Sequence, residues 1–389
     1  MTTGLRVANR ISQIAEFWKP LADELYALPN WLQTAEQRSA GACHYAVLRR
    51  DGSPVGALVG YETLPDSWFF TNPVALLTQS TSTLEPFLDE TERSELLAAA
   101  GQLTQAQARL YPALVSVLPS GYLPGLLRGA GADGTVTEQL ADELGRLADE
   151  HGYATTAVMH VREEDTDLRE RLVGRGYLPF ASVGDCVLHT PWDDFDDYLA
   201  SLTSPRPNRI RREIRSFTES GAVLRETPLN ALGEEHARLH ALHMRRYGHE
   251  AEVAASRQLI ANIQAHPTGR GRVLEARRGD ELVGFVVFYE LGQTFHPKMI
   301  GIAEGEKRAF TYFNLTYYGL IRIALAEGIR CIGYGPEAYE AKALRGCSLE
   351  RRVNHVLVPR EFRGPATRAA ELVDRAYRRR MDRHDWARG

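Results

Sequence analysis

Four residues in the second half of the sequence have the types and spacing of an anion-binding cluster. They are Glu337, Tyr339, Lys342 and Arg345. They follow an expected strand at 330–334, and ligands of open α/β sheets usually bind at the carboxyl ends of strands. Lys342 and Arg345 lie three residues apart, which places them on one face of a helix. They could clamp a phosphate or carboxylate, or form surface ion pairs with Glu337 or Glu340.

A second candidate for anion binding is the arginine-rich stretch 204–217. Its arginines are Arg206, Arg209, Arg211, Arg212 and Arg215. Arginine clusters suit phosphates, such as those of tRNA, a nucleotide-linked precursor or a pantetheine arm. Aromatic residues do not interleave with them, so stacking of single-stranded bases is not indicated. The alternative is a solvated basic helix, in which Glu213 and Glu219 dilute the positive charge.

Acid–base and polar catalytic roles have four candidates: His296, His355, Tyr312 and Asn314. Imidazole titrates near neutral pH, so either histidine could accept a proton, although a single histidine in a strand is more often a packing residue. Tyr312 lies in the first turn of an expected helix, and Asn314 lies on its polar face. That face either lines a cleft or is a half-buried helix edge.

A metal site is not expected. His236, His240 and His243 have roughly helical spacing, but no cysteine or carboxylate completes a ligand set. The four cysteines have no metal-binding or redox spacing, and the simplest interpretation is reduced thiols in a cytoplasm.

Composition narrows the class of protein further. The chain has 389 residues, 44% hydrophobic and 25% charged, and a net charge of −4. It is long enough for two domains and is not a basic nucleic-acid binder as a whole. It has neither an apolar run of membrane-spanning length nor a secretory signal. These features predict a cytoplasmic protein with no membrane or DNA partner.

An internal repeat organises these candidate residues into two halves. Residues 48–62, LRRDGSPVGALVGYE, align without a gap with residues 276–290, ARRGDELVGFVVFYE. Both segments have the pattern of an antiparallel hairpin, and we expect the two hairpins to be equivalent elements of two similar sheets. Each is followed by a helix, a strand, a short helix and a strand, with extra residues at about 63–136 in the first half. The predicted domains are 1–190 and 191–389.

This order of elements resembles the GNAT acyltransferase core. Two such cores in tandem, with the segments 201–224 and 312–359, resemble the Fem-like aminoacyl transferases and the peptidoglycan-biosynthesis-like acyltransferases. The more specific part is the G-x-x-x-x-x-x-K-x-x-R-G pattern that ends at Gly346. The resemblance implies an α/β fold of tandem GNAT-like domains with mixed sheets flanked by helices, and an active site in the second domain.

The resemblance also implies a reaction but leaves its partners open. Fem-like proteins transfer an amino acid from aminoacyl-tRNA to an amine of a cell-wall precursor, and related natural-product enzymes acylate small amines or hydroxylamines. GNAT enzymes bind coenzyme A in a glycine-rich loop before the main helix. Here that stretch, 300–313, has only Gly305 between strand and helix, although Lys307 and Arg308 could hold some phosphate.

These features favour an enzyme that forms an amide or ester bond and uses aminoacyl-tRNA as its donor. The tRNA is expected to bind weakly and transiently, and no other cofactor is expected. The alternatives are a transferase that uses acyl-coenzyme A or a carrier protein, and a non-catalytic recognition protein.

Overall fold

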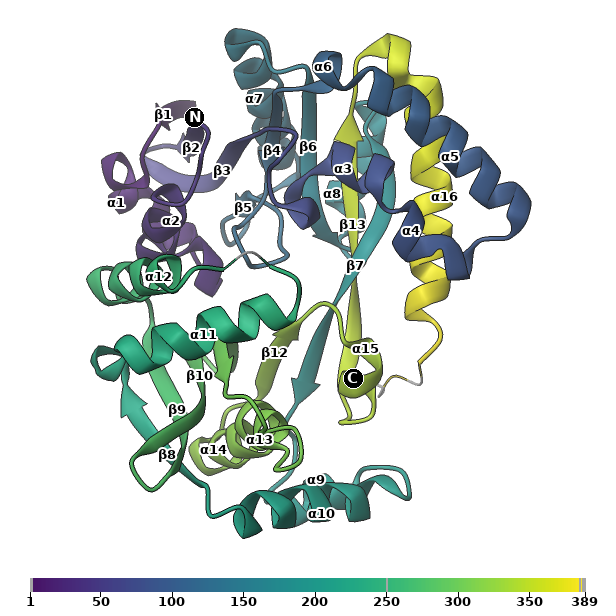
Figure 1. Ribbon diagram of the computed structural model, residues 1–389. Helices are drawn as coiled ribbons and strands as arrows, with labels where there is room; N and C mark the ends of the chain where they lie inside the picture. Colours follow the sequence, from purple (N-terminus) through teal and green to yellow (C-terminus); the bar gives the residue numbers. More distant parts are fainter. Residues whose placement is uncertain (1–2, 250, 385, 387–389) are drawn as a thin grey trace. The chain divides into compact units, whose positions relative to one another are not determined.

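The computed structural model describes residues 3–249, 251–384 and 386. The fold is a mixed α/β structure with a large mixed sheet flanked by helices (Figure 1). The chain divides into two compact units. Unit 1 contains Met1–Asp185, Gly335–Glu337 and Glu350–Asp385, and unit 2 contains Cys186–Tyr334, Ala338–Leu349 and Trp386–Gly389. The predicted domain boundary at 190/191 lies near the first division, but residues 350–385 belong with unit 1.

The two repeated segments fold as hairpins with the same register. In unit 1 they are β2 (Cys43–Arg50) and β3 (Ser53–Thr63), and in unit 2 they are β9 (Arg270–Arg278) and β10 (Glu281–Leu291). Leu48 faces Gly56 in the first hairpin, and Ala276 faces Gly284 at the equivalent place in the second. Both hairpins also carry a bulge near this point. The repeat read from the sequence is therefore a repeat of structure.

In unit 1, the strands continue from this hairpin to a parallel pair. The strands are β1 (Thr3–Ala8), β4 (Ala113–Ser116), β5 (Leu126–Arg128), β6 (Thr155–Arg162) and the first part of β7 (Leu178–His189). Helix α7 (Gly134–His151) connects β4 to β6. Its Val136, Leu140, Leu144 and Leu147 are buried in the core at helical spacing.

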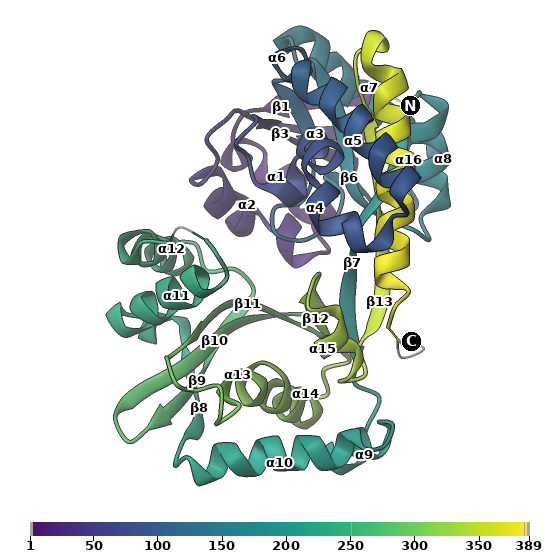
Figure 2. The same ribbon diagram turned by 45° about the vertical axis from the view of Figure 1, so that its right-hand side comes forward.

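Unit 2 repeats the same order of elements. Its further strands are β8 (Val223–Pro228), β11 (Thr294–Ile302) and β12 (Cys331–Gly335). Helices α11 (Glu234–Arg246) and α12 (Val253–Ala265) cover one face of β8–β11 (Figure 2). The opposite face carries α10 (Arg206–Glu219) and a continuous helix formed by α13 (Thr311–Phe313), the π-helical segment η7 (Asn314–Gly319) and α14 (Leu320–Glu327).

Two separate sheets were expected, and this expectation is wrong. The strands are hydrogen-bonded in one order, β1-β2-β3-β4-β6-β13-β7-β12-β11-β10-β9-β8, with β5 beside β3. The reason is that β7 and β13 (Ser348–Leu357) cross the divisions between the units at 185/186 and 349/350. The part of β13 from Glu350 onward pairs antiparallel with β6 within unit 1.

The extra residues of the first half form helices that pack against the C-terminal helix of unit 1. They include α3 (Pro73–Gln79), α4 (Thr81–Leu84), α5 (Glu90–Gln105) and α6 (Gln107–Leu110). Helix α16 (Arg363–Met381) lies beside α5 in both views (Figures 1 and 2). Glu92 of α5 is buried and accepts hydrogen bonds from Arg375 and Arg379 of α16.

Acid should weaken the contact between α5 and α16, because it protonates Glu92. Hydrogen bonds from Arg379 and Arg375 lower the pKa of Glu92 from about 4.5 to about 2. A lowered carboxyl pKa stabilises the fold above the unfolded-state value and loses that contribution as pH falls through the folded-state value. We expect Glu92→Gln to lower the free energy of unfolding at pH 6, and the difference from wild type to shrink between pH 4.5 and 2. Urea titrations across this range would measure it, and a pH-independent difference would contradict the assignment.

Candidate active site

The carboxyl end of β12 forms the centre of the candidate site in unit 2. Strand β11 pairs in parallel with β12 at two positions, Thr294 with Cys331 and Phe295 with Ile332. The next residues of β11 are His296 and Pro297, and proline has no N–H to donate to a ladder. The residues of β12 beyond those paired with β11 are Gly333, Tyr334 and Gly335. This is the type of strand end at which α/β sheets bind ligands.

His296, which the sequence analysis names as a candidate base, lies at this point. It is buried, and a Cβ atom placed on Gly333 would be 3.6 Å from its Nδ1 atom. Burial, and then the charge of Lys298, lower the pKa of His296 to about 3. The imidazole is therefore neutral at pH 7. The same low pKa makes it a weak base.

Lys342 joins His296 at the end of β12. It lies in the short helix α15 (Tyr339–Ala343), is buried, and donates from Nζ to the backbone oxygen of Tyr334 at 3.0 Å. An ammonium group carries three donors and a full positive charge. The structure thus places Lys342 and His296, which are 46 residues apart in the sequence, against the adjacent β12 residues Tyr334 and Gly333.

A row of aromatic rings extends from this point along the π-helical segment. The rings of Tyr334 and Tyr317 are stacked at 4.5 Å, and those of Tyr317 and Tyr312 are 6.3 Å apart. Tyr312 in turn lies 6.4 Å from the ring of His243, nearly parallel to it. Single-turn π-segments are frequent at functional sites. Sequence reasoning selected Tyr312 but missed Tyr317 and Tyr334, whose only signal was the density of tyrosines around 312–339.

Arg345 does not lie with Lys342 as one half of a clamp. Its guanidinium group is buried, donates from Nη2 to Glu213 Oε2 at 3.1 Å, and lies 3.7 Å from the ring centroid of Phe313. Glu213 also accepts a hydrogen bond from Tyr318. The helix face predicted to carry Lys342 and Arg345 is buried. The charge of Arg345 is neutralised by Glu213 within the core of unit 2.

Asn314 takes part in the same buried cluster instead of lining a cleft. Its Nδ2 atom donates to the backbone oxygens of Glu213 at 3.2 Å and Phe310 at 3.0 Å. Thr311 on the same face bonds to Glu306. The polar face of the helix therefore packs against α10 and the preceding loop. Glu213, which seemed only to dilute a basic patch, is the centre of these contacts.

Glu337 and His355 belong to unit 1 and are not combined with the unit 2 residues. Glu337 forms an ion pair with Arg380 of α16. His355 lies fully buried in β13, and burial, followed by the charge of Arg169, lowers its pKa to about 3. Tyr339 is in unit 2, but it is buried, with its ring 5.8 Å from that of Trp386.

The arginines of α10 divide into one buried and four exposed residues. Arg209, Arg211, Arg212 and Arg215 are exposed. Arg209 lies 3.3 Å from Glu213, and Arg211 lies 3.8 Å from Asp196. Arg206 is only 7% exposed. The predicted basic surface is present on this helix, and Arg206 stands apart from it.

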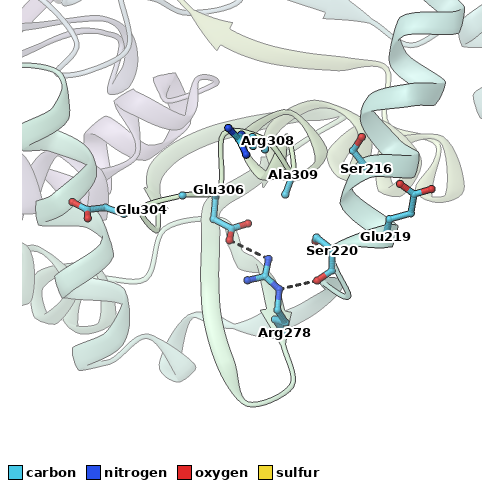
Figure 3. Close-up of a pocket in the computed structure, with 9 residues that line it drawn as sticks. Ser216, Glu219, Ser220, Arg278, Glu304, Glu306, Arg308 and Ala309 are labelled. Atoms are coloured by element: carbon cyan, nitrogen blue, oxygen red, sulfur yellow. Dashed lines mark hydrogen bonds and ion pairs between the residues drawn. The ribbon is translucent and has the colours of Figure 1, made fainter.

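The loop before α13 lines a pocket of about 560 Å³ (Figure 3). Its lining residues are Ser216, Glu219, Ser220, Arg278, Glu304, Gly305, Glu306, Arg308 and Ala309. Glu306 accepts hydrogen bonds from Arg278 and from Thr311 in the first turn of α13. Arg308 lines the pocket, but three glutamates and only two arginines line it. Lys307 is exposed and does not line it.

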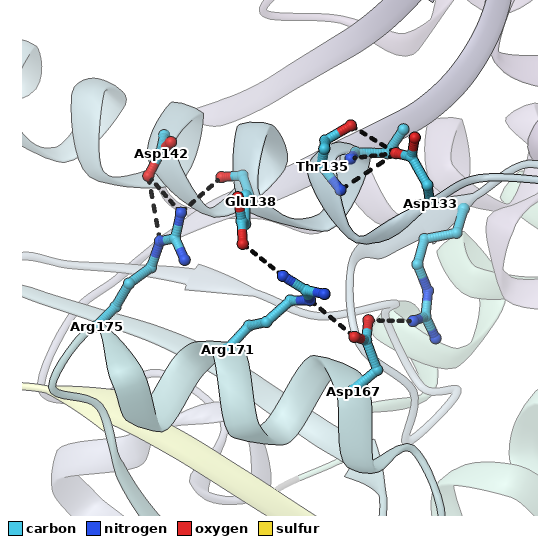
Figure 4. Close-up of polar contacts among 9 residues, drawn as sticks. Asp133, Thr135, Glu138, Asp142, Asp167, Arg171 and Arg175 are labelled. Carbon is cyan, nitrogen blue, oxygen red and sulfur yellow. Dashed lines mark hydrogen bonds and ion pairs between the residues drawn. The ribbon is translucent and has the colours of Figure 1, made fainter.

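The equivalent region of unit 1 is closed. β4 and β6 pair in parallel as far as Ser116 and Val158. A Cβ atom on Gly125 would lie 2.7 Å from Ser116 Oγ, so the backbone at Gly125 already fills this space. The helix after β4, α7, begins with Asp133, whose carboxylate accepts from the N–H groups of Thr135 and Val136 (Figure 4). This cap leaves no room for an anion at that helix end.

A metal centre has no support among residues 3–249, 251–384 and 386, where no cluster of three His, Cys, Asp or Glu side chains is found. The histidines of α11 have other contacts. His236 is 3.1 Å from Glu275 Oε1, and His240 is 2.8 Å from Ser256 Oγ. Over the same described part of the chain, every helix is too short or too polar to cross a bilayer.

The two units, with the same order of strands and helices, form a tandem α/β fold. Residues 97–384 match the FemAB-like family, described as peptidoglycan biosynthesis/recognition. Since this match covers more than half of the sequence, the chain belongs to the FemAB-like family. A search of curated proteins finds no match.

The first two of the following solved structures share the fold at low sequence identity. The crystal structure of FemX is 9% identical, covers 93% of this chain and 98% of that chain, and has a TM-score of 0.59. A conserved protein of unknown function from Bacteroides thetaiotaomicron is 12% identical, with coverages of 92% and 100% and a TM-score of 0.53. A tandem GNAT protein from the clavulanic acid biosynthesis pathway is 13% identical, with coverages of 92% and 98% and a TM-score of 0.49.

Proposed function

We propose that this protein transfers an aminoacyl group from aminoacyl-tRNA to a small acceptor, an amine, hydroxylamine or cell-wall precursor, and that the reaction takes place in unit 2 at the end of β12. FemAB-like membership and the arrangement of Lys342, His296 and the tyrosine row support this assignment. The choice of aminoacyl-tRNA over acyl-coenzyme A as donor rests on the charges at the start of α13.

Coenzyme A is disfavoured by the charge at that helix start. A helix N-terminus attracts a pyrophosphate through its N–H groups and its partial positive charge. Here the buried carboxylate of Glu306 bonds to Thr311 in the first turn, and Glu304 and Glu219 line the adjacent pocket. A pyrophosphate would meet this negative charge. The exposed arginines of α10 offer phosphate contacts along a helix, which suit a longer polyanion better.

In the proposed reaction, the neutral amine attacks the ester carbonyl carbon of the aminoacyl group. An amide bond forms, the ester bond to the tRNA breaks, and the proton of the amine passes to the leaving 3′-oxygen. The ammonium of Lys342 stabilises the negative charge that develops on the carbonyl oxygen. His296, with a pKa of about 3, is too weak a base to remove this proton, so its neutral ring orients the substrate.

We expect turnover with charged tRNA and an amine acceptor to stop when RNase is added. It should also fall steeply with salt, because bound phosphates release counterions. Arg212→Ala should weaken tRNA binding to a similar extent for every tRNA sequence, since backbone contacts do not read bases. The measurement is transfer of a radiolabelled amino acid to the acceptor. Turnover with an acyl-coenzyme A in the RNase-treated assay would refute the tRNA donor.

A further inference from the structure

Arg206 carries a buried positive charge that the fold does not pair. The residue is 7% exposed, and its Nε atom has no hydrogen-bond partner among the described residues. A buried guanidinium group normally forms several hydrogen bonds, because removing a charge from water is costly without a partner. Arg345, Arg352 and Arg272 also leave one buried nitrogen each without a hydrogen-bond partner among the described residues, but each forms an ion pair with at least one carboxylate.

The surroundings of Arg206 have an excess of positive charge. Burial, and then the charge of Arg345, lower the pKa of Arg206, and Arg209 acts in the same direction. The opposing carboxylate is Glu213, which already bonds to Arg345, Arg209 and Tyr318. Arg345 and Arg209 thus bond to one carboxylate, Arg206 adds a third positive charge nearby, and an added anion would balance them.

The start of α10 adds to this positive potential. The 14-residue helix begins at Arg206, has no side-chain cap, and has no acidic residue in its first turn. Its positive dipole end is therefore uncompensated, in contrast to α7 with its Asp133 cap. Arg206 and Arg209 lie three residues apart, so both side chains are near neighbours on this first turn.

We propose that Arg206, with Arg209 and the start of α10, forms a subsite for one phosphate group. A phosphate has the charge and the acceptor oxygens that two guanidinium groups and a helix N-terminus can bind together. Its source is either the backbone of the tRNA donor or a phosphorylated small molecule. Only the choice of source rests on the proposed function.

The test measures binding of inorganic phosphate to the full chain by calorimetry and by thermal shift at constant ionic strength. We expect saturable binding to the wild type, and at least a tenfold loss of affinity in Arg206→Met, because charge-assisted hydrogen bonds are lost. Arg225→Met is the matched control, since Arg225 is an exposed arginine of β8, and should bind phosphate as the wild type does.

Stability provides a second readout. Without phosphate, Arg206→Met should unfold at a temperature no lower than the wild type, because the substitution removes an unpaired buried charge. If Arg206→Met fails to fold, Arg206→Lys gives the same comparison, with weakened phosphate binding. Equal phosphate affinity in the wild type and the Arg206 variants, or no saturable binding to the wild type, would overturn the proposal.

Competition identifies the source of the phosphate. Displacement of inorganic phosphate by tRNA would assign the subsite to the nucleic-acid backbone, and displacement by pyrophosphate but not by tRNA would assign it to a small phosphorylated molecule. Because binding is measured without turnover, phosphate binding at Arg206 together with absent tRNA-dependent transfer would leave the subsite standing and remove the proposed function.

Discussion

Arg345→Ala should destabilise the protein by about 3–5 kcal/mol, because it leaves the Glu213 carboxylate buried without its partner. The two side chains are 2% and 1% exposed and 3.1 Å apart. Glu213 retains the hydrogen bond from Tyr318, but Arg209, its remaining cation, is more than half exposed. The measurement is the free energy of unfolding in urea. A substrate clamp, which the sequence left open, would instead predict a loss of catalysis with an unchanged melting temperature.

A double variant distinguishes the effect of losing the ion pair from the effect of losing side-chain packing. Glu213→Gln combined with Arg345→Met removes both charges and keeps the approximate volumes, so it should be less destabilised than Arg345→Ala. Arg128, whose side chain is one-third exposed in its ion pair with Asp165, provides the surface control, and Arg128→Ala should cost less than about 1 kcal/mol. A stable Arg345→Ala protein with impaired turnover would restore the substrate-clamp interpretation.

Lys342→Met should lower kcat/KM by about tenfold or more, because the carbonyl oxygen loses its charged partner in the transition state. Methionine keeps most of the packing of the buried side chain, although the Tyr334 carbonyl loses its hydrogen bond. The comparison with Lys19→Met, an exposed lysine of unit 1, controls for the loss of one charge.

The division between kcat and KM shows what Lys342 does. A fall confined to kcat indicates an interaction made in the transition state, whereas a rise confined to KM indicates binding of substrate and transition state alike. Full activity of a folded Lys342→Met protein would remove Lys342 from the proposed mechanism.

The sequence predicted the local elements well because local patterns determine them. The alternation and turns of 48–62 and 276–290 predicted two hairpins, which have the same register. The position of Lys342 after β12 was also predictable from the order of the elements. The choice of Lys342 and His296 as site residues stays a prediction, and the structure places them against the adjacent residues Tyr334 and Gly333.

Burial and long-range pairing were not predictable, because they depend on contacts between distant segments. Glu213 and Arg345 are 132 residues apart, so neither spacing nor local charge indicated their ion pair. The same holds for Arg378, Arg379 and Arg380 near the end of α16, which pair with carboxylates of unit 1. The paths of β7 and β13 across the units likewise had no local signal.

The assignment of residues 350–385 to unit 1 has a consequence for the order in which the protein folds during synthesis. Unit 1 takes its first 185 residues from the beginning of the chain, but its part of β13, from Glu350 onward, and helix α16 follow all of unit 2 except residues 386–389. On the ribosome, β6 therefore lacks its antiparallel neighbour, and α5 lacks its helical partner, until nearly all of unit 2 has emerged. Domains usually fold as units from the N-terminus onward during translation. In this protein, nearly all of unit 2 has been synthesised before unit 1 has its complete sequence.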